Sequence, residues 1–308
     1  MSQSTYILCP GQGAQAVGMG KALVEKSPAA RELFEQAGKL LRFDLAAVCF
    51  DGPEDRLNQT DVSQPALYVA GVASSLAAEQ RGLIDRDAVV AYAGLSLGEY
   101  TALHLAGALG FDDGLRLVAA RGRYMQEAAV AVPSGMVAVM GADEAAVLAL
   151  CESAAHGEVL VPANFNAPGQ IVVSGSRAAC ERVLPAAEAK GFKAVALKVA
   201  GAFHSPIMQP AAERMRAELD KIGFRAPSRT VYSNVTGRPH AADAGSIREK
   251  LVQQIVEPVR WEQTMQALVA EAPGGRFVEL SPGRTLAGLA KRINRRLPVE
   301  GVETLMAS

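Results

Sequence analysis

One five-residue segment, Gly94-Leu95-Ser96-Leu97-Gly98, constrains the fold of this chain more than any other feature of its sequence. It follows the apolar run 89–93 and precedes a segment with helical spacing. This is the strand–turn–helix context of the G-x-S-x-G nucleophile elbow. Both glycines would let neighbouring backbone approach a tightly bent serine. The order therefore predicts a sheet strand that ends at a reactive Ser96 hydroxyl.

The helix predicted after Ser96 supports a chemical role for this turn. Its free backbone N–H groups would point at the serine, so negative charge that develops on a substrate carbonyl would be stabilised there. The alternative is an ordinary Gly-Ser turn at a helix N-terminus, because five-residue patterns also recur by chance. The rest of the chain must decide between the two.

Short apolar runs bounded by Gly and Pro alternate with longer amphipathic segments, which is typical of an α/β fold. Strands are predicted at 5–9, 89–93, 230–233 and 276–280. Between about 134 and 199 the order is strand 136–140, helix 143–153, strands 159–161 and 170–174, helix 177–190 and strand 194–199. This βαββαβ order is that of a ferredoxin-like unit. We expect a large α/β-hydrolase-like domain with a parallel sheet, made of residues 1–132 and 200–308, and an inserted small ferredoxin-like subdomain, 133–199.

Charge, apolar patterning and cysteine spacing exclude several classes of protein. The 31 Lys and Arg residues are balanced by 32 Asp and Glu residues, so nothing favours a nucleic acid or an anionic membrane as partner. No stretch of 18 apolar residues occurs and the start of the chain lacks a basic, signal-like segment. The four cysteines are widely and irregularly spaced, which predicts reduced, buried residues. We expect a cytoplasmic protein.

Arg121 is singled out by helical periodicity. In the helix predicted to begin near Asp112, it shares a face with apolar side chains at i−4, i−3, i+4 and i+7, namely Leu117, Val118, Met125 and Ala128. A guanidinium that faces inward must find an anion or lose several kcal/mol of hydration. The anion could be a core carboxylate in a structural ion pair or the carboxylate of a substrate. The spacing alone leaves both open.

Five ordered motifs connect the chain to a known family. Besides the elbow they are CPGQGAQ at 9–15, RGRYMQ at 121–126, GAFHS at 201–205 and QQIVEPVRW at 253–261, with the further stretches NFNAPGQ at 164–170 and SNVTG at 233–237. With these motifs, spread over residues 9–291, the chain resembles the malonyl-CoA:acyl-carrier-protein transacylases, the acyltransferases of fatty acid and polyketide synthesis.

The resemblance implies an activity and a reaction path. A malonyl group would move from malonyl-CoA to the phosphopantetheine thiol of holo acyl carrier protein, through a malonyl-serine ester on Ser96. His204 would be the general base, held by the main-chain carbonyl of Gln254, in a Ser-His dyad rather than a triad. The Gln12 and Leu97 N–H groups would form the oxyanion hole. This is ping-pong covalent catalysis, which needs no metal or redox cofactor.

The resemblance also implies the residues that recognise the substrate. Arg121 would hold the free malonate carboxylate, and Phe203 would fill the space that an α-methyl group needs, favouring malonyl over methylmalonyl. Asn164, Asn166 and Gln64 would line the pocket. The chain departs from many members at Leu95, where they carry histidine, so any role of that imidazole is not expected here. The remaining histidines, His104, His156 and His240, are expected on a helix, in a loop and in a turn, with no catalytic part.

Two alternatives differ in chemistry. A serine thioesterase or acyl hydrolase of the same elbow geometry would release its acid to water and would need an Asp or Glu partner for the histidine. An inward Arg121 argues against it, since a hydrolase of neutral esters gains nothing from a buried cation. A non-catalytic docking module would not need Ser96 and His204 together. Basic patches at Lys190, Lys193 and Lys198 and at residues 291–296 could dock an acidic carrier protein or be ordinary solvated surface.

Overall fold

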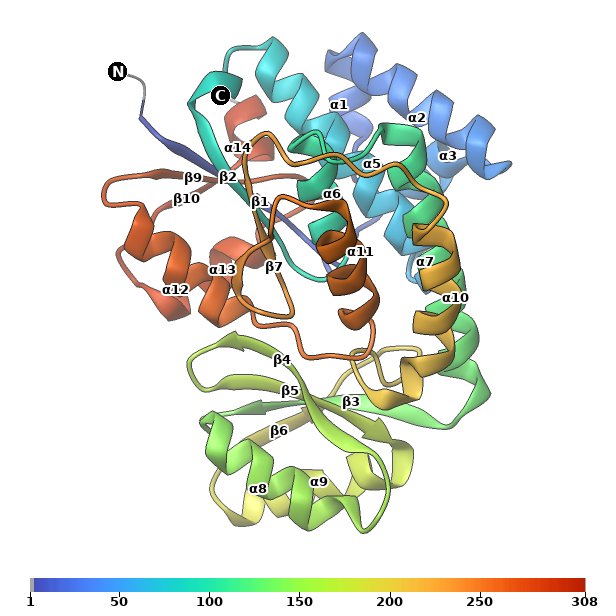
Figure 1. Ribbon diagram of the computed structural model, residues 1–308, viewed down its shortest axis with the longest axis vertical. Helices are drawn as coiled ribbons and strands as arrows, with labels where there is room; N and C mark the ends of the chain where they lie inside the picture. Colours follow the sequence, from blue (N-terminus) through green and yellow to red (C-terminus); the bar gives the residue numbers. More distant parts are fainter. Residues whose placement is uncertain (1–2, 308) are drawn as a thin grey trace.

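Two β-sheets organise the chain in the computed structural model, which describes residues 3–307 (Figure 1). The first sheet has the strand order β10-β9-β1-β2-β7-β8 and the second has the order β4-β5-β3-β6. The strands are β1 (Thr5–Cys9), β2 (Val89–Gly94), β3 (Ser134–Met140), β4 (Leu160–Ala167), β5 (Gln170–Ser176), β6 (Lys193–Ala196), β7 (Thr230–Ser233), β8 (Arg238–Pro239), β9 (Arg276–Glu279) and β10 (Val299–Gly301).

Fourteen α-helices and two short 3-10 helices are found within residues 3–307. The α-helices are α1 (Lys21–Lys26), α2 (Pro28–Leu41), α3 (Leu45–Asp51), α4 (Glu54–Leu57), α5 (Thr60–Gln80), α6 (Gly98–Leu105), α7 (Phe111–Ala131), α8 (Glu144–Ala155), α9 (Arg177–Ala189), α10 (Gln209–Leu219), α11 (Ala244–Gln253), α12 (Trp261–Glu271), α13 (Thr285–Ile293) and α14 (Val302–Ala307). The 3-10 helices are η1 (Arg86–Ala88) and η2 (Pro206–Met208). None of the described helices combines the length and apolar character needed to cross a membrane.

The first sheet is parallel except for β8, and helices cover both of its faces (Figure 1). Side chains alternate along β1: Ile7 and Cys9 pack into the core that includes α5 and α7, whereas Tyr6 and Leu8 pack against α12 and α13. Burial on both faces explains why β1 is apolar throughout rather than alternating with polar residues. The carboxyl ends of β1, β2 and β7 therefore meet at one edge, where ligand sites of open α/β sheets lie.

The second sheet is antiparallel and lies between its own helices α8 and α9 and the larger part of the molecule (Figure 1). Along β3, Val137 and Val139 pack with α8 and α9, whereas Met136 belongs to the main core. The element order β3-α8-β4-β5-α9-β6 is the βαββαβ order that the sequence predicted. The hydrolase-like and ferredoxin-like classifications stay predictions, and so does the division at 1–132, 133–199 and 200–308. Of the first and last of these ranges, residues 1, 2 and 308 lie outside the described residues.

Backbone hydrogen bonds join the second sheet to the segment that precedes α12. Phe165 N–H donates to the Val259 carbonyl at 2.9 Å, and Val259 N–H donates to the Ala163 carbonyl at 2.8 Å. Asn164 forms an isolated parallel bridge with Val259 in the same place. This junction explains why β4 extends to Ala167, beyond the predicted strand 159–161: its second half has a partner from the other part of the molecule as well as β5.

Most strand boundaries agree with the sequence predictions. β1 and β7 match them, and β2 and β9 each differ by one residue. β6 ends at Ala196 instead of 199, because only Lys193–Ala196 pair with β3. The two short strands β8 and β10 were not predicted. All four cysteines are buried and unpaired, as expected.

Candidate active site

The elbow sequence forms a tight turn between β2 and α6, with Ser96 at its tip. Ser96 has a φ of 52°, in the left-handed region that side chains rarely occupy. A Cβ on Gly94 would lie 1.9 Å from the Gly98 carbonyl carbon, and one on Gly98 would lie 2.1 Å from the Cys9 carbonyl oxygen. Both positions require glycine because backbone fills the space. The turn is therefore packed backbone against backbone, which fixes the Ser96 hydroxyl.

Ser96 and His204 meet at the carboxyl end of the parallel sheet. Ser96 Oγ lies 2.9 Å from His204 Nε2, and His204 Nδ1 lies 2.7 Å from the Gln254 main-chain oxygen. A carbonyl only accepts hydrogen bonds, so Nδ1 carries the proton and Nε2 is free to accept one from the serine. His204 itself has a φ of 56° in the loop before η2. The arrangement is that of a nucleophile, a base and an orienting carbonyl.

The electrostatic surroundings keep His204 neutral. Burial is the larger cause and the Arg121 charge the second, and together they lower the pKa of His204 from 6.5 to about 4. The hydrogen bond to Gln254 opposes this shift. At neutral pH the imidazole is therefore unprotonated, as a general base must be.

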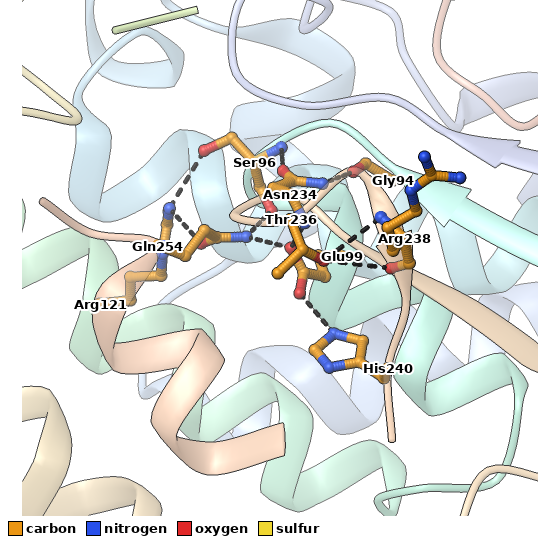
Figure 2. A network of polar contacts seen from close by, with 9 residues as sticks. All are labelled: Gly94, Ser96, Glu99, Arg121, Asn234, Thr236, Arg238, His240 and Gln254. Carbon is orange, nitrogen blue, oxygen red and sulfur yellow. Dashed lines mark hydrogen bonds and ion pairs between the residues drawn. The ribbon is translucent and has the colours of Figure 1, made fainter. Parts of the chain in front are cut away.

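Arg121 reaches Ser96 from α7 and is 1% exposed. Its Nη1 donates to Gln64 Oε1 at 2.8 Å. Its Nη2 donates to Ser96 Oγ and to Gln254 Oε1, both at 3.0 Å (Figure 2). The Nε–H is buried and has no hydrogen-bond partner among residues 3–307. The apolar side chains that share its helical face, Leu117, Val118, Met125 and Ala128, are all buried, as the periodicity predicted.

Within residues 3–307, Arg121 forms no ion pair with a carboxylate. Burial lowers its pKa, while the neighbouring Tyr100 and Glu99 oppose this change. A buried cation without an ion-pair partner and with a free N–H is poorly compensated. The structural ion pair that the sequence left open is thus not what the structure contains, and an anionic ligand would supply the missing partner.

Two backbone N–H groups, of Gln12 and Leu97, are candidates to bind a developing oxyanion. In the described part of the chain, neither Gln12 N–H nor Leu97 N–H donates to another protein group. The two loops that carry them are held together, since Leu95 N–H donates to the Cys9 carbonyl at 3.1 Å. A Cβ on Gly11 would lie 2.2 Å from the Leu95 carbonyl oxygen, so the loops touch through their backbones. Free donors on two adjoining loops are the components of an oxyanion hole.

A cavity of about 750 Å³ contains these groups. Most of the residues predicted for the site line it directly, namely Gln12, Ser96, Arg121, Asn164, Phe203 and His204. Leu95 also lines it. Gln64 and Gln254 do not line it and act on it through their hydrogen bonds to Arg121. Asn166 is outside the lining.

Three residues beside the site were not predicted: Glu99, Asn234 and His240. They connect behind Ser96 in one buried network (Figure 2). Two signals could have pointed to them. Glu99 lies one helical turn after Ser96, and Asn234 lies in the SNVTG stretch, to which no role was given.

The chain matches proteins of known structure and activity over nearly its whole length. The family model "Acyl transferase domain" matches residues 5–303. The malonyl CoA-acyl carrier protein transacylase of Salmonella typhimurium is 40% identical over 309 residues, covering 100% of this chain and 96% of that protein. The solved malonyl CoA-acyl carrier protein transacylase from Coxiella burnetii has a TM-score of 0.93 at 40% identity, covering 99% of this chain and 97% of the other. A chain of the solved complex between a type II polyketide synthase acyl-carrier protein and its malonyl-transacylase gives a TM-score of 0.91 at 36% identity, covering 99% of each chain.

Proposed function

The chain belongs to the acyl transferase domain family, and from this we propose that it transfers the malonyl group of malonyl-CoA to the phosphopantetheine thiol of an acyl carrier protein. The observation that carries the proposal is the distance of 3.0 Å between Arg121 Nη2 and Ser96 Oγ. In a malonyl thioester one methylene separates the reacting carbonyl from the free carboxylate. A cation that recognises this carboxylate must therefore lie beside the nucleophile.

The first half-reaction acylates the serine. His204 Nε2 takes the Ser96 proton as Oγ attacks the thioester carbonyl, and the oxyanion accepts hydrogen bonds from Gln12 N–H and Leu97 N–H. Each such donor is typically worth about 3 kcal/mol of barrier. When the tetrahedral intermediate collapses, the C–S bond breaks, the coenzyme A thiolate takes the proton from His204, and a malonyl-serine ester remains.

The second half-reaction returns the enzyme to its starting state. The phosphopantetheine thiol gives its proton to His204 and attacks the ester carbonyl, and the Ser96 oxygen leaves and regains the proton. During both steps Arg121 holds the malonyl carboxylate with Nε–H and Nη2–H, which lie along one edge of the guanidinium. The residues on this path act as acid, base, nucleophile and anion clamp, so the proposed chemistry needs no metal or redox cofactor.

The carrier protein is the proposed macromolecular partner. A related transacylase has been solved in complex with its acyl-carrier protein, and the relatives include proteins named malonyl CoA-acyl carrier protein transacylase and polyketide biosynthesis protein ThaF. Lys198, from one of the predicted basic patches, lines the cavity that contains Ser96. Lys190 and Lys193, from the same patch, are exposed. An acidic carrier would meet these charges as its thiol enters the cavity.

A thioesterase or acyl hydrolase is not favoured. The partner of His204 Nδ1 is a main-chain carbonyl, whereas that class uses an Asp or Glu. The buried Arg121 cation would also have no anionic partner when the acyl group is neutral.

Intact-mass analysis of the protein after mixing with malonyl-CoA tests the proposal. We expect a long-lived adduct of one malonyl group that disappears when holo carrier protein is added. Ser96→Ala should abolish the adduct without unfolding the chain, since only the hydroxyl is removed. Ser174→Ala is the matched control, because Ser174 is also buried, its Oγ has no partner, and it lies outside the cavity. A Ser96→Ala protein that still became malonylated would refute the assignment, and a short-lived adduct discharged by water would indicate a hydrolase.

A further inference from the structure

The Glu99 carboxylate is fully buried in the first turn of α6, three residues after Ser96. Its Oε2 accepts a hydrogen bond from Gln254 Nε2 at 2.7 Å and another from the Asn234 backbone N–H at 3.0 Å. Its Oε1 lies 2.6 Å from His240 Nε2 (Figure 2). Three donors from two distant segments therefore converge on one carboxylate directly behind the nucleophile.

The contact between Glu99 and Gln254 decides which end of the Gln254 amide faces Arg121. Gln254 Nε2 donates to Glu99 and to the Ser96 carbonyl, the latter at 2.9 Å, so Oε1 must face Arg121 Nη2. A rotated amide would place its NH₂ group against the guanidinium, where both groups are donors. The main-chain oxygen of the same residue holds His204. By fixing Gln254, Glu99 thus helps to position both Arg121 and His204.

The contact with Asn234 bears on the nucleophile turn itself. Asn234 Oδ1 accepts from Ser96 N–H at 2.5 Å, and Nδ2 donates to the Gly94 carbonyl at 2.7 Å (Figure 2). One side chain therefore bridges both ends of the segment that leads into the strained φ of Ser96. Its own backbone N–H is held by Glu99. A turn with an unfavourable backbone conformation persists only when its surroundings hold it in place.

His240 completes the attachment from the far end of the same hairpin. β7 and β8 pair Tyr232 with Pro239 and Ser233 with Arg238, so Asn234 lies in the turn between the two strands and His240 directly follows β8. Both residues reach Glu99. The His240 side chain is fully buried, and its Nδ1 has no partner within the described chain. Glu99 is the acceptor that satisfies the other ring nitrogen.

We propose that Glu99 is a positioning residue for acyl transfer, held by His240 and acting through Gln254 and Asn234 on the groups that react. The inference rests on the function proposed above, because it takes Ser96 as the nucleophile. It assigns to Glu99 no contact with substrate: its carboxylate accepts from three protein donors, and it does not line the cavity.

Substitutions at position 99 should act in a graded way. Glu99→Gln leaves one oxygen for three donors, so one donor is left unsatisfied or His240 must move its proton to the unpartnered Nδ1. A buried donor without an acceptor costs enough to lower a population about 10-fold or more. Glu99→Met has similar length and no acceptor, so both Gln254 and Asn234 lose their anchor.

Glu279 offers a matched control. It is also fully buried and accepts two backbone hydrogen bonds, from Leu286 N–H and Ala287 N–H at 2.8 Å each, at the start of α13 and away from the cavity. Glu279→Met makes the same chemical change at a site that only supports the fold. It should lower the melting temperature without changing the reactivity of the folded protein.

The experiment measures the second-order rate at which a fluorophosphonate labels Ser96, together with kcat/KM for malonyl- and acetyl-CoA, in folded protein. The label reports serine and base reactivity without any acyl substrate. We expect rates about 10-fold lower for Glu99→Gln and at least about 100-fold lower for Glu99→Met, with a reduced malonyl-to-acetyl ratio in both, and unchanged values for Glu279→Met.

The outcomes separate the two proposals. If the unmodified protein is not labelled at Ser96, the proposed catalytic function fails, whatever position 99 does. If it is labelled and Glu99→Gln retains its rate within about twofold and its substrate ratio, Glu99 is not a positioning residue. The glutamine variant is sufficient to distinguish these outcomes, so the test stands even when Glu99→Met does not fold. A loss of melting temperature with unchanged rates would likewise reduce Glu99 to a structural role.

Discussion

Replacing Arg121 with alanine removes a cation that donates a hydrogen bond to Ser96 Oγ. This side chain forms three hydrogen bonds to neutral groups, on Gln64, Ser96 and Gln254, and no ion pair with a carboxylate of residues 3–307. The hydrogen bonds of His204 to Ser96 and Gln254 do not involve Arg121. The variant should therefore keep a reactive serine and lose the recognition of a free carboxylate.

The expected magnitude follows from what the bound malonyl group loses. A bidentate, charge-assisted pair in a buried site costs about 2 to 5 kcal/mol when one partner is truncated, which is about 30- to 5000-fold in kcat/KM for malonyl-CoA. Acetyl-CoA carries no carboxylate and should lose much less. Because Arg121 is 1% exposed without an ion pair, its removal also ends the cost of burying an uncompensated charge.

The assay compares kcat/KM for malonyl- and acetyl-CoA with the melting temperature of the same preparations. Arg121→Lys is the control, since it keeps the charge but cannot bind a carboxylate through two parallel hydrogen bonds. Its malonyl-to-acetyl ratio should lie between those of the unmodified protein and Arg121→Ala. A folded Arg121→Ala protein with an unchanged malonyl-to-acetyl ratio would refute the assignment. An equal loss for both thioesters with a lower melting temperature would instead indicate a structural role.

Three further predictions concern His204 and the acyl pocket. The pKa of His204 is lowered from 6.5 to about 4, so kcat/KM for acetyl-CoA should fall only as the pH drops towards 4. Arg121→Ala should shift this acidic decrease in kcat/KM to higher pH, because the Arg121 charge contributes to the lowered pKa. An inflection near pH 6.5 in both proteins would contradict this prediction. Over the same window the unfolded chain binds a proton that the native His204 does not, so stability should decrease as pH falls from 6.5 to 4, measured by denaturant unfolding. Phe203→Ser should open space beside the acyl group, since Phe203 lines the cavity and is buried, and should raise methylmalonyl relative to malonyl transfer by about 10- to 200-fold; an unchanged ratio would show that Phe203 does not contact the α-carbon.

The parts of the site that sequence reasoning reached are those with local signals. Ser96 was predicted from the glycines and the strand and helix on either side, and the inward position of Arg121 followed from the spacing of apolar residues along one helix. Both depend on patterns within a short stretch of the chain. The roles of His204, Gln12 and Leu97 came from the family resemblance, and the structure places all three at the same cavity or beside it.

The parts that sequence reasoning missed are set by tertiary contacts. Glu99 resembled an ordinary acid in the first turn of a helix, and His240 a residue in a turn. Their contact forms only because β7 pairs with β2, which places the β7–β8 hairpin beside α6. β8 and β10 were missed for a similar reason, since strands of two or three residues have no periodicity of their own and form only where a longer neighbour offers hydrogen bonds.

The interlocked backbones at the elbow have a consequence for how selectivity could be altered, by design or by mutation. At Gly11, Gly94 and Gly98 no room exists for even one methyl group, so these positions cannot be used to reshape the acyl pocket. Variation that preserves the nucleophile must come from side chains that face the cavity, such as Leu95 and Phe203. A library restricted to those cavity-facing positions would vary which acyl group is accepted while leaving the reactive turn intact.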